Sequence, residues 1–197
     1  MYKAHDITCP GCGAPQSPEN RICEYCGRPV VITSFSAMDG MSLPVLNKYA
    51  ASYRNTLAAD PENTAAGISL GMCCLKLRLY DKAVSAFEKA MESEFDNADL
   101  YFYTAIALLN GTKPFLVPRK TIDKAESYIN AAIMIEPKAV YYLLWAYIRY
   151  DHHYRKSYVM HPDHAELLRS AHEAGLAGGD IPQLFGILGT PVPDAIK

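Results

Sequence analysis

Two C-x-x-C motifs stand near the N-terminus of this chain, in the stretch "CPGCGAPQSPENRICEYCG" that covers residues 9 to 27. Ten residues separate Cys12 from Cys23, which is enough chain for a tight hairpin that brings the two motifs together. A glycine follows each motif, at Gly13 and Gly27, so the backbone can turn under the sulfurs with its N–H groups directed at them. Four thiolates placed in this way can surround one metal ion. The spacing predicts a metal site with these four ligands: Cys9, Cys12, Cys23 and Cys26.

The other two cysteines do not suit a disulfide framework. Cys73 and Cys74 are adjacent inside a helical pattern, where a thiol packs as a small apolar group. The chain has 197 residues and a net charge of −2, which suits one or two compact domains and gives no sign of a strongly charged partner. Its N-terminus lacks the apolar core of a signal peptide, and no stretch reaches the length needed to span a bilayer. We therefore expect a cytoplasmic protein without membrane contact.

The segment from about residue 4 to residue 35 resembles the zinc ribbon family, which carries the same paired C-x-x-C-G motifs. The resemblance implies a small β zinc ribbon in which the four cysteines hold one structural Zn²⁺, tetrahedral and without an open position. The flanking stretches "YKAHDIT" and "PVVITSF" favour extended chain on both sides of the motifs. Because so small a segment buries little core, the ion would supply most of its folding free energy, on the order of 10 kcal/mol.

Three other uses of the cysteines fit the sequence less well. A rubredoxin-like iron site has similar motifs but a longer span between them and an aromatic shell, whereas Tyr25 is the one ring nearby here. A thioredoxin-like redox pair requires a strand-to-helix junction in a βαβ unit, and no such unit surrounds either motif. Catalytic zinc requires an open coordination position, which four thiolates do not leave. The residues favour a structural zinc ion.

Zinc ribbons often bind nucleic acid, but the charge of this one argues against that role. Within residues 1 to 35 three basic residues are balanced by three acidic ones, and a tetrathiolate zinc centre would add negative charge. Binding to phosphates depends on several clustered Lys or Arg side chains. Nucleic acid is therefore disfavoured as a partner and is kept as the alternative.

The remainder of the chain reads as helices. Residues 36 to 42, "SAMDGMS", are small and polar and predict a linker between the ribbon, residues 1–35, and a helical domain, residues 43–197. The clearest helical stretch is "GISLGMCCLKLRLYDKAVSAFEKAMES", which has apolar residues at helical spacing on both sides of a turn. The pattern returns at shifts of 34, 42 and 42 residues, a period that predicts stacked helical hairpins.

This pattern resembles the tetratricopeptide repeat (TPR) family. The residues that match its consensus are Leu70, Gly71, Ala83, Phe87 and Ala90. Two large consensus residues are replaced, the Trp by Gly67 and the Tyr by Cys74. The resemblance implies an all-α, right-handed array of helical hairpins with about seven helices. The tail "DIPQLFGILGTPVPDAIK" predicts one more, capping helix, with Asp180 as N-cap and Gly189 as terminator.

Members of this family bind ligands on a concave surface that the first helix of each hairpin lines. By register, the lining residues here are Ile68, Met72, Leu75, Phe102, Ile106, Leu109, Leu144 and Ile148. All eight are apolar, so the resemblance implies a protein or peptide ligand with an apolar surface. Apolar residues at helical spacing are also typical of a core, and the chain's own tail at residues 184–188 or a second copy in a homodimer is an alternative occupant.

Two long loops form a second candidate site. In a stacked array, residues 111–120 and 151–163 should lie along one edge. The basic and aromatic residues of this loop edge are Lys113, Arg119, Lys120, His152, His153, Tyr154, Arg155 and Lys156. Such an edge can meet an acidic partner or RNA, although a merely solvated loop has the same composition.

No sequence motif of an enzyme is present. A phosphate-binding glycine loop and a G-x-S-x-G nucleophile elbow are both absent. The sequence therefore predicts a non-enzymatic adaptor that uses a structural zinc ribbon and a TPR-like array to bind another protein. The alternative is a nucleic-acid-associated regulatory factor that uses the ribbon and the loop edge.

Overall fold

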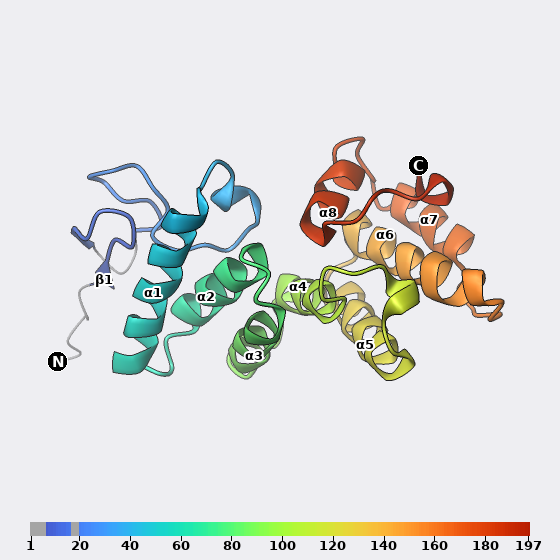
Figure 1. The fold of residues 1–197 in the computed structure, drawn as a ribbon, viewed down its shortest axis with the longest axis horizontal. Helices are drawn as coiled ribbons and strands as arrows, with labels where there is room; N and C mark the ends of the chain where they lie inside the picture. Colours follow the sequence, from blue (N-terminus) through green and yellow to red (C-terminus); the bar gives the residue numbers. More distant parts are fainter. Residues whose placement is uncertain (1–6, 17–19) are drawn as a thin grey trace. The chain divides into compact units, whose positions relative to one another are not determined.

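A computed structural model describes residues 7–16 and 20–197 of the chain. The chain divides into two compact units, residues 1–93 and residues 94–197. The described residues form eight α-helices in successive hairpins (Figure 1), which agrees with the all-α array that the repeat pattern predicts. Within the described residues, no helix is both long enough and apolar enough to cross a membrane.

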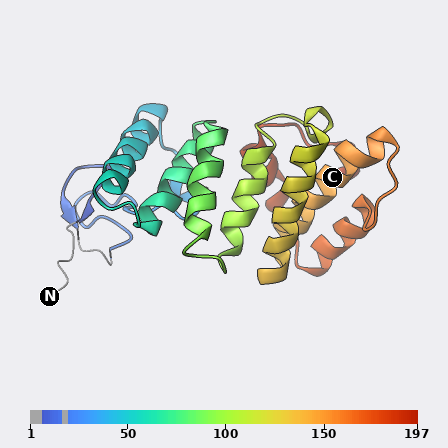
Figure 2. The same ribbon diagram turned by 90° about the horizontal axis from the view of Figure 1, so that it is seen from below.

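The first unit contains three helices: α1 (Leu43–Ala59), α2 (Thr64–Lys76) and α3 (Tyr80–Met91). Helix α2 lies between α1 and α3 in both ribbon views (Figures 1 and 2). Its N-terminus is capped by Asn63, whose side chain accepts a hydrogen bond of 3.0 Å from the Ala66 N–H. Arg78 has a φ of 59° and turns the chain from α2 into α3.

Helix α2 has a glycine, Gly71, where it packs against Phe87 of α3. A Cβ built on Gly71 would lie 2.5 Å from Cε1 of Phe87, whose side chain is completely buried. A Cβ at this distance would force the buried Phe87 ring to shift, and shifting a packed core side chain is costly. Gly71 is therefore required for the spacing of this hairpin.

The two glycines of α2 give a matched test of this spacing. We expect Gly71→Ala to lower the free energy of unfolding by about 1 to 2 kcal/mol, because overpacking outweighs the gain in helix propensity. At Gly67 an added Cβ meets no atom within 4 Å, so Gly67→Ala should raise stability by about 0.5 to 1 kcal/mol. Urea unfolding of both variants measures the two effects, and equal effects would contradict the packing argument.

The ribbon segment has little sheet structure in the described residues. Strands β1 (Ile7–Thr8) and β2 (Pro15–Gln16) pair antiparallel, and one isolated bridge joins Ile22 to Pro29. The predicted β ribbon is therefore present in these residues only as short pairings and not as an extended sheet. The bridge is formed by the Cys23 N–H bond to the Arg28 carbonyl and the Val30 N–H bond to the Arg21 carbonyl, each of 2.8 Å. The pairings stay short because Pro15 and Pro29 have no N–H to donate to a longer ladder. Residues 2–6 of the stretch expected to precede the first motif lie outside the described residues.

The segment after the ribbon belongs to the first unit. Residues 36–42, predicted to be a linker, contain a 3₁₀ turn at Ser36–Met38, and the Met38 side chain is buried. Val30 and Ile32 just before it are buried as well. Met38 therefore anchors this segment to the first unit, while Ser36, Asp39, Gly40 and Ser42 stay exposed.

The second unit contains five helices: α4 (Ala98–Leu108), α5 (Arg119–Ile135), α6 (Ala139–Ile148), α7 (His164–Glu173) and α8 (Asp180–Leu188). Within this unit, α4 packs against α5, and α6 packs against α5, α7 and α8. Helix α6 continues into a π-helical turn at Arg149–His153. Helix α8 ends at Gly189, which has a φ of 67°, as predicted. Its N-cap position belongs to Gly179, so the predicted cap at Asp180 is wrong by one residue.

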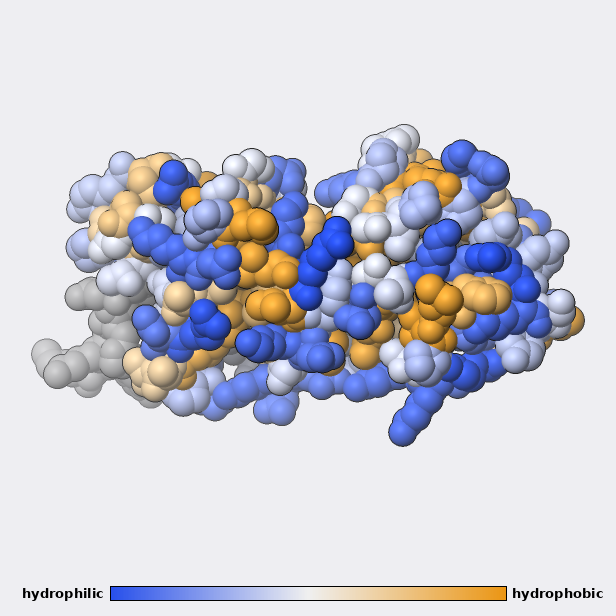
Figure 3. Space-filling model, viewed as in Figure 1, coloured by the Kyte–Doolittle hydropathy of each residue, from blue (hydrophilic) through white to orange (hydrophobic). Residues whose placement is uncertain are grey.

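The surface mixes apolar and polar residues. On the face drawn in Figure 3, apolar side chains form patches among the hydrophilic ones in each unit. Several large apolar side chains are exposed, among them Phe95, Leu116 and Met134. Single exposed apolar residues are normal on a soluble surface and do not by themselves mark a binding site.

Candidate metal centre and partner-binding surfaces

The four cysteines of the two motifs come together as predicted. Their ligand atoms all lie within 4.8 Å of one another, and within the described part of the chain no other cluster of this kind occurs. Cys9 Sγ is 3.7 Å from Cys26 Sγ, and Cys12 Sγ is 3.7 Å from Cys23 Sγ. Four sulfurs at the Zn–S distance of about 2.3 Å form a tetrahedron with edges of about 3.8 Å. The four thiols therefore fit a tetrahedral metal ion such as zinc.

The backbone turns under the sulfurs differ in one detail from the expectation. Gly13 and Gly27 have φ values of 81° and 66°, which favour glycine, as predicted. Their N–H groups, however, donate to the carbonyls of Cys9 and Cys23, each at 2.8 Å, and not to sulfur. Amides that face a sulfur include that of Gly11, 3.3 Å from Cys9 Sγ, and that of Tyr25, directed at Cys23. The glycines close the turns, and the residue between the cysteines directs its N–H to the ligand.

The cysteine cluster is attached to helix α1. Lys48 Nζ donates a hydrogen bond of 2.6 Å to the Gly11 carbonyl, and a Cβ on Gly11 would lie 3.0 Å from Tyr49 Oη. The buried Tyr53 hydroxyl donates a hydrogen bond of 2.9 Å to the carbonyl of Val30, which packs against Cys9 and Cys23. The metal site and the first helix therefore form one packed body.

Removing the Tyr53 hydroxyl tests this attachment. We expect Tyr53→Phe to lower the free energy of unfolding by about 1 to 3 kcal/mol, because the buried Val30 carbonyl loses its donor. Tyr25→Phe, in which the ring is 73% exposed, serves as the control and should stay within about 0.5 kcal/mol. Denaturant unfolding compares the two variants, and an equally small effect at both positions would contradict the inferred role of the hydrogen bond.

The segment after the ribbon runs along helix α2. The Ile32 N–H donates a hydrogen bond of 2.9 Å to Ser69 Oγ. Further along the helix, Lys76 Nζ lies 3.9 Å from Asp39 Oδ1 and 4.2 Å from the centre of the Phe35 ring. These contacts place residues 32–39 over the length of α2 between Ser69 and Lys76.

The eight residues predicted to line a concave groove are buried. None of their side chains is more than 6% exposed; they are Ile68, Met72, Leu75, Phe102, Ile106, Leu109, Leu144 and Ile148. In the second unit α8 packs against α6, where the rings of Tyr147 and Phe185 lie 4.8 Å apart. Leu184 and Leu188 of the tail are buried as well. A partner would reach these eight positions only by displacing parts of this chain.

The two loops of the predicted edge touch each other. The Phe115 N–H donates a hydrogen bond of 2.8 Å to Asp151 Oδ2, and the Phe115 ring lies under Arg155 and Lys156. Of the loop edge, Lys113, Arg119, Lys120, Tyr154 and Arg155 are exposed and Lys156 is half-buried. Arg119 and Arg155 are neutralised by Asp123 and Asp151, four residues away from each.

His152 and His153 do not belong to this exposed edge. Both are only 1% exposed, because the helix continues past Ile148 and turns them inward. His153 Nε2 lies 3.1 Å from Glu126 Oε1, and Arg149 Nε lies 3.0 Å from the same oxygen. Their placement on a solvated loop was therefore wrong.

A buried charged cluster results, which the sequence reading missed. Burial lowers the pKa of His153 to about 4, so the ring is neutral at pH 7, and its Nε2 lies within hydrogen-bond distance of Glu126 Oε1. Burial raises the pKa of Glu126, and the Arg149 guanidinium opposes that rise. A sequence signal was present: Glu126 lies between Ile122 and Ile129 on the buried side of α5. A carboxylate on an apolar helix face predicts a buried cation.

Comparison with known proteins identifies the fold of the helical part. No protein-family model matches the chain, and no curated protein matches it. A solved structure named "MamA MSR-1 C2" covers 71% of this chain and 72% of its own, with 19% identical residues and a TM-score of 0.51. Another, "MamA AMB-1 P212121", covers 72% and 78%, with 21% identity and a TM-score of 0.45. The likeness to the first shows a TPR-like array of helical hairpins.

Proposed function

We propose that this chain is a non-enzymatic adaptor that binds another protein through its TPR-like array, with a structural zinc ion holding the ribbon. The fold supports a scaffold for protein interaction, since arrays of this kind are extended surfaces built from repeated hairpins. The observation that carries the proposal is the attachment of the cysteine cluster to α1 and α2. A ribbon bound so firmly to the helices is part of the scaffold.

The proposed zinc ion has a structural role. Cys9, Cys12, Cys23 and Cys26 would hold it, and four thiolate ligands leave no position for a substrate. Two of the four side chains, Cys9 and Cys23, are buried. The ion would fix the two turns, and through Val30 and Ile32 it would fix the segment that covers α2.

The adaptor function is tested by reconstitution with a purified partner. The full chain, loaded with zinc, is immobilised, and proteins captured from a lysate of its host are identified by mass spectrometry. Each candidate is then purified and titrated into the chain by calorimetry. We expect a complex of defined stoichiometry with at least one protein. If every purified candidate fails to bind, the adaptor function is refuted.

A further inference from the structure

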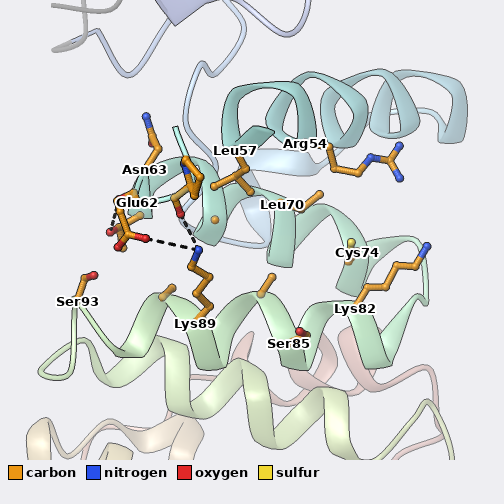
Figure 4. Close-up of a pocket in the computed structure, with 15 residues that line it drawn as sticks. Arg54, Leu57, Glu62, Asn63, Leu70, Cys74, Lys82, Ser85, Lys89 and Ser93 are labelled. Atoms are coloured by element: carbon orange, nitrogen blue, oxygen red, sulfur yellow. Dashed lines mark hydrogen bonds and ion pairs between the residues drawn. The ribbon is translucent and has the colours of Figure 1, made fainter. Parts of the chain in front are cut away.

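A cavity of about 350 Å³ opens between the three helices of the first unit. Leu57 of α1, Leu70 of α2 and Ala86 of α3 contribute to its apolar lining, and Gly67 and Cys74 line it from α2 (Figure 4). We call this cavity the outer pocket. Residues 67, 70 and 74 of α2 line the outer pocket, whereas residues 68, 72 and 75 of the same helix were predicted to line the concave groove.

The outer pocket lies where the repeat consensus places its two largest side chains. Gly67 occupies the consensus Trp position and Cys74 the consensus Tyr position. A Cβ on Gly67 would meet no atom within 4 Å, so the space above this residue is open. The chain has thus replaced two aromatic side chains that would otherwise fill this space. Apolar space of this size is where a partner's side chain gains most by burial.

Charge is distributed unequally around the outer pocket. At one end Lys89 reaches Glu62, 3.8 Å away, and the Pro61 carbonyl, 2.8 Å away (Figure 4). At the other end Arg54 and Lys82 flank Cys74, and in the described part of the chain neither forms an ion pair. Burial raises the pKa of Cys74, and the positive charges of Arg54 and Lys82 oppose that rise. Both cations therefore act on the interior of the pocket.

We propose that the outer pocket binds a segment of a partner protein that carries a bulky apolar side chain, Trp or Leu, next to acidic residues. The apolar side chain takes the space that Gly67 and Cys74 leave. The acidic residues pair with Arg54 and Lys82 at the rim, where charge complementarity selects the partner. This inference rests on the proposed adaptor function and names the surface and the chemistry of the partner.

The test uses an array of labelled peptides and the zinc-loaded full chain. Each peptide of about 12 residues carries a central Trp, Leu or Ala, flanked by Glu, Gln or Lys at helical or extended spacing. Binding is measured by fluorescence anisotropy at low and at high salt. We expect the peptides with Trp or Leu flanked by Glu to bind about tenfold or more tightly than their Ala or Lys counterparts, with weaker binding at high salt.

Substitutions in the chain test whether the peptides bind in the outer pocket. Gly67→Trp restores the consensus side chain and should weaken binding of the best peptide about tenfold or more, with the fold retained. Gly186→Trp is the matched control, since Gly186 is also a helical glycine with open space above it. Lys82→Glu should weaken binding and shift the preference towards Lys peptides, whereas Lys120→Glu on α5 should change neither.

Several results would overturn the inference. One is that none of the peptides binds, and another is that Glu and Lys peptides bind equally well. A third is that Gly67→Trp binds the best peptide with an affinity within about twofold of that of the parent chain. A dimer that Gly67→Trp abolishes would show that a second copy fills the pocket. Direct binding of oleate by the chain, together with binding by none of the peptides, would indicate that the pocket takes a fatty acid. If Gly67→Trp still binds a reconstituted partner, the adaptor function stands and the outer pocket is not its surface.

Discussion

The substitution Cys23→Ser is expected to abolish metal binding and to detach the ribbon from the helices. Cys23 is 1% exposed and supplies one of the four ligands, so the remaining three thiols cannot close the tetrahedron. The apparent binding free energy of a structural zinc ion is on the order of 10 kcal/mol, and most of it is folding free energy for a segment this small. No other substitution considered for this chain should have a larger effect.

Native mass spectrometry and amide hydrogen exchange measure this effect together. The parent chain should carry one zinc ion, and Cys23→Ser or chelation should remove it. The Ile32 amide, bonded to Ser69, should then exchange rapidly while α5 and α6 stay protected. Cys73→Ala, a buried cysteine outside the cluster, is the control and should keep one ion. If the Ile32 amide stays protected from exchange after chelation, the structural role of the ion is contradicted. If the chain carries iron, the proposal of zinc is contradicted.

The substitution Glu126→Gln is expected to lower the free energy of unfolding by about 3 to 5 kcal/mol. Glu126 is the carboxylate that compensates Arg149, and the Arg149 side chain is only 7% exposed. Removing the carboxylate charge leaves a buried guanidinium without its counter-ion, which is among the costliest changes in a protein interior. The size of the side chain is kept, so packing contributes little.

Asp123→Asn on the same helix is the matched control. Asp123 pairs with Arg119 at 2.7 Å, but both side chains are about half exposed. Loss of such a surface pair should cost less than about 1 kcal/mol. Adding Arg149→Met to Glu126→Gln removes the unpaired charge and should recover part of the lost stability. Urea unfolding follows all four chains, and similar losses for Glu126→Gln and Asp123→Asn would contradict the buried pair.

The elements with a local cause were predictable from the sequence. The cluster of four cysteines followed from the spacing of the two C-x-x-C motifs, because a short hairpin brings the two motifs together. The helices followed from apolar periodicity, and the end of α8 followed from Gly189, whose φ of 67° few other residues adopt. Even the outer pocket had a local sign, the absence of two large residues at positions 67 and 74.

Burial by distant segments was decided by the tertiary fold. Ile68 and Met72 look like a binding surface in the repeat register, but the chain between the ribbon and α1 runs along this helix, as the Ile32 bond to Ser69 shows. His153 looks like a loop residue, but the π-helical turn brings it to Glu126, 27 positions earlier in the chain. Periodicity reports which side of a helix is apolar. Which segment covers that side depends on contacts between residues far apart in the sequence, and only the folded chain brings them together.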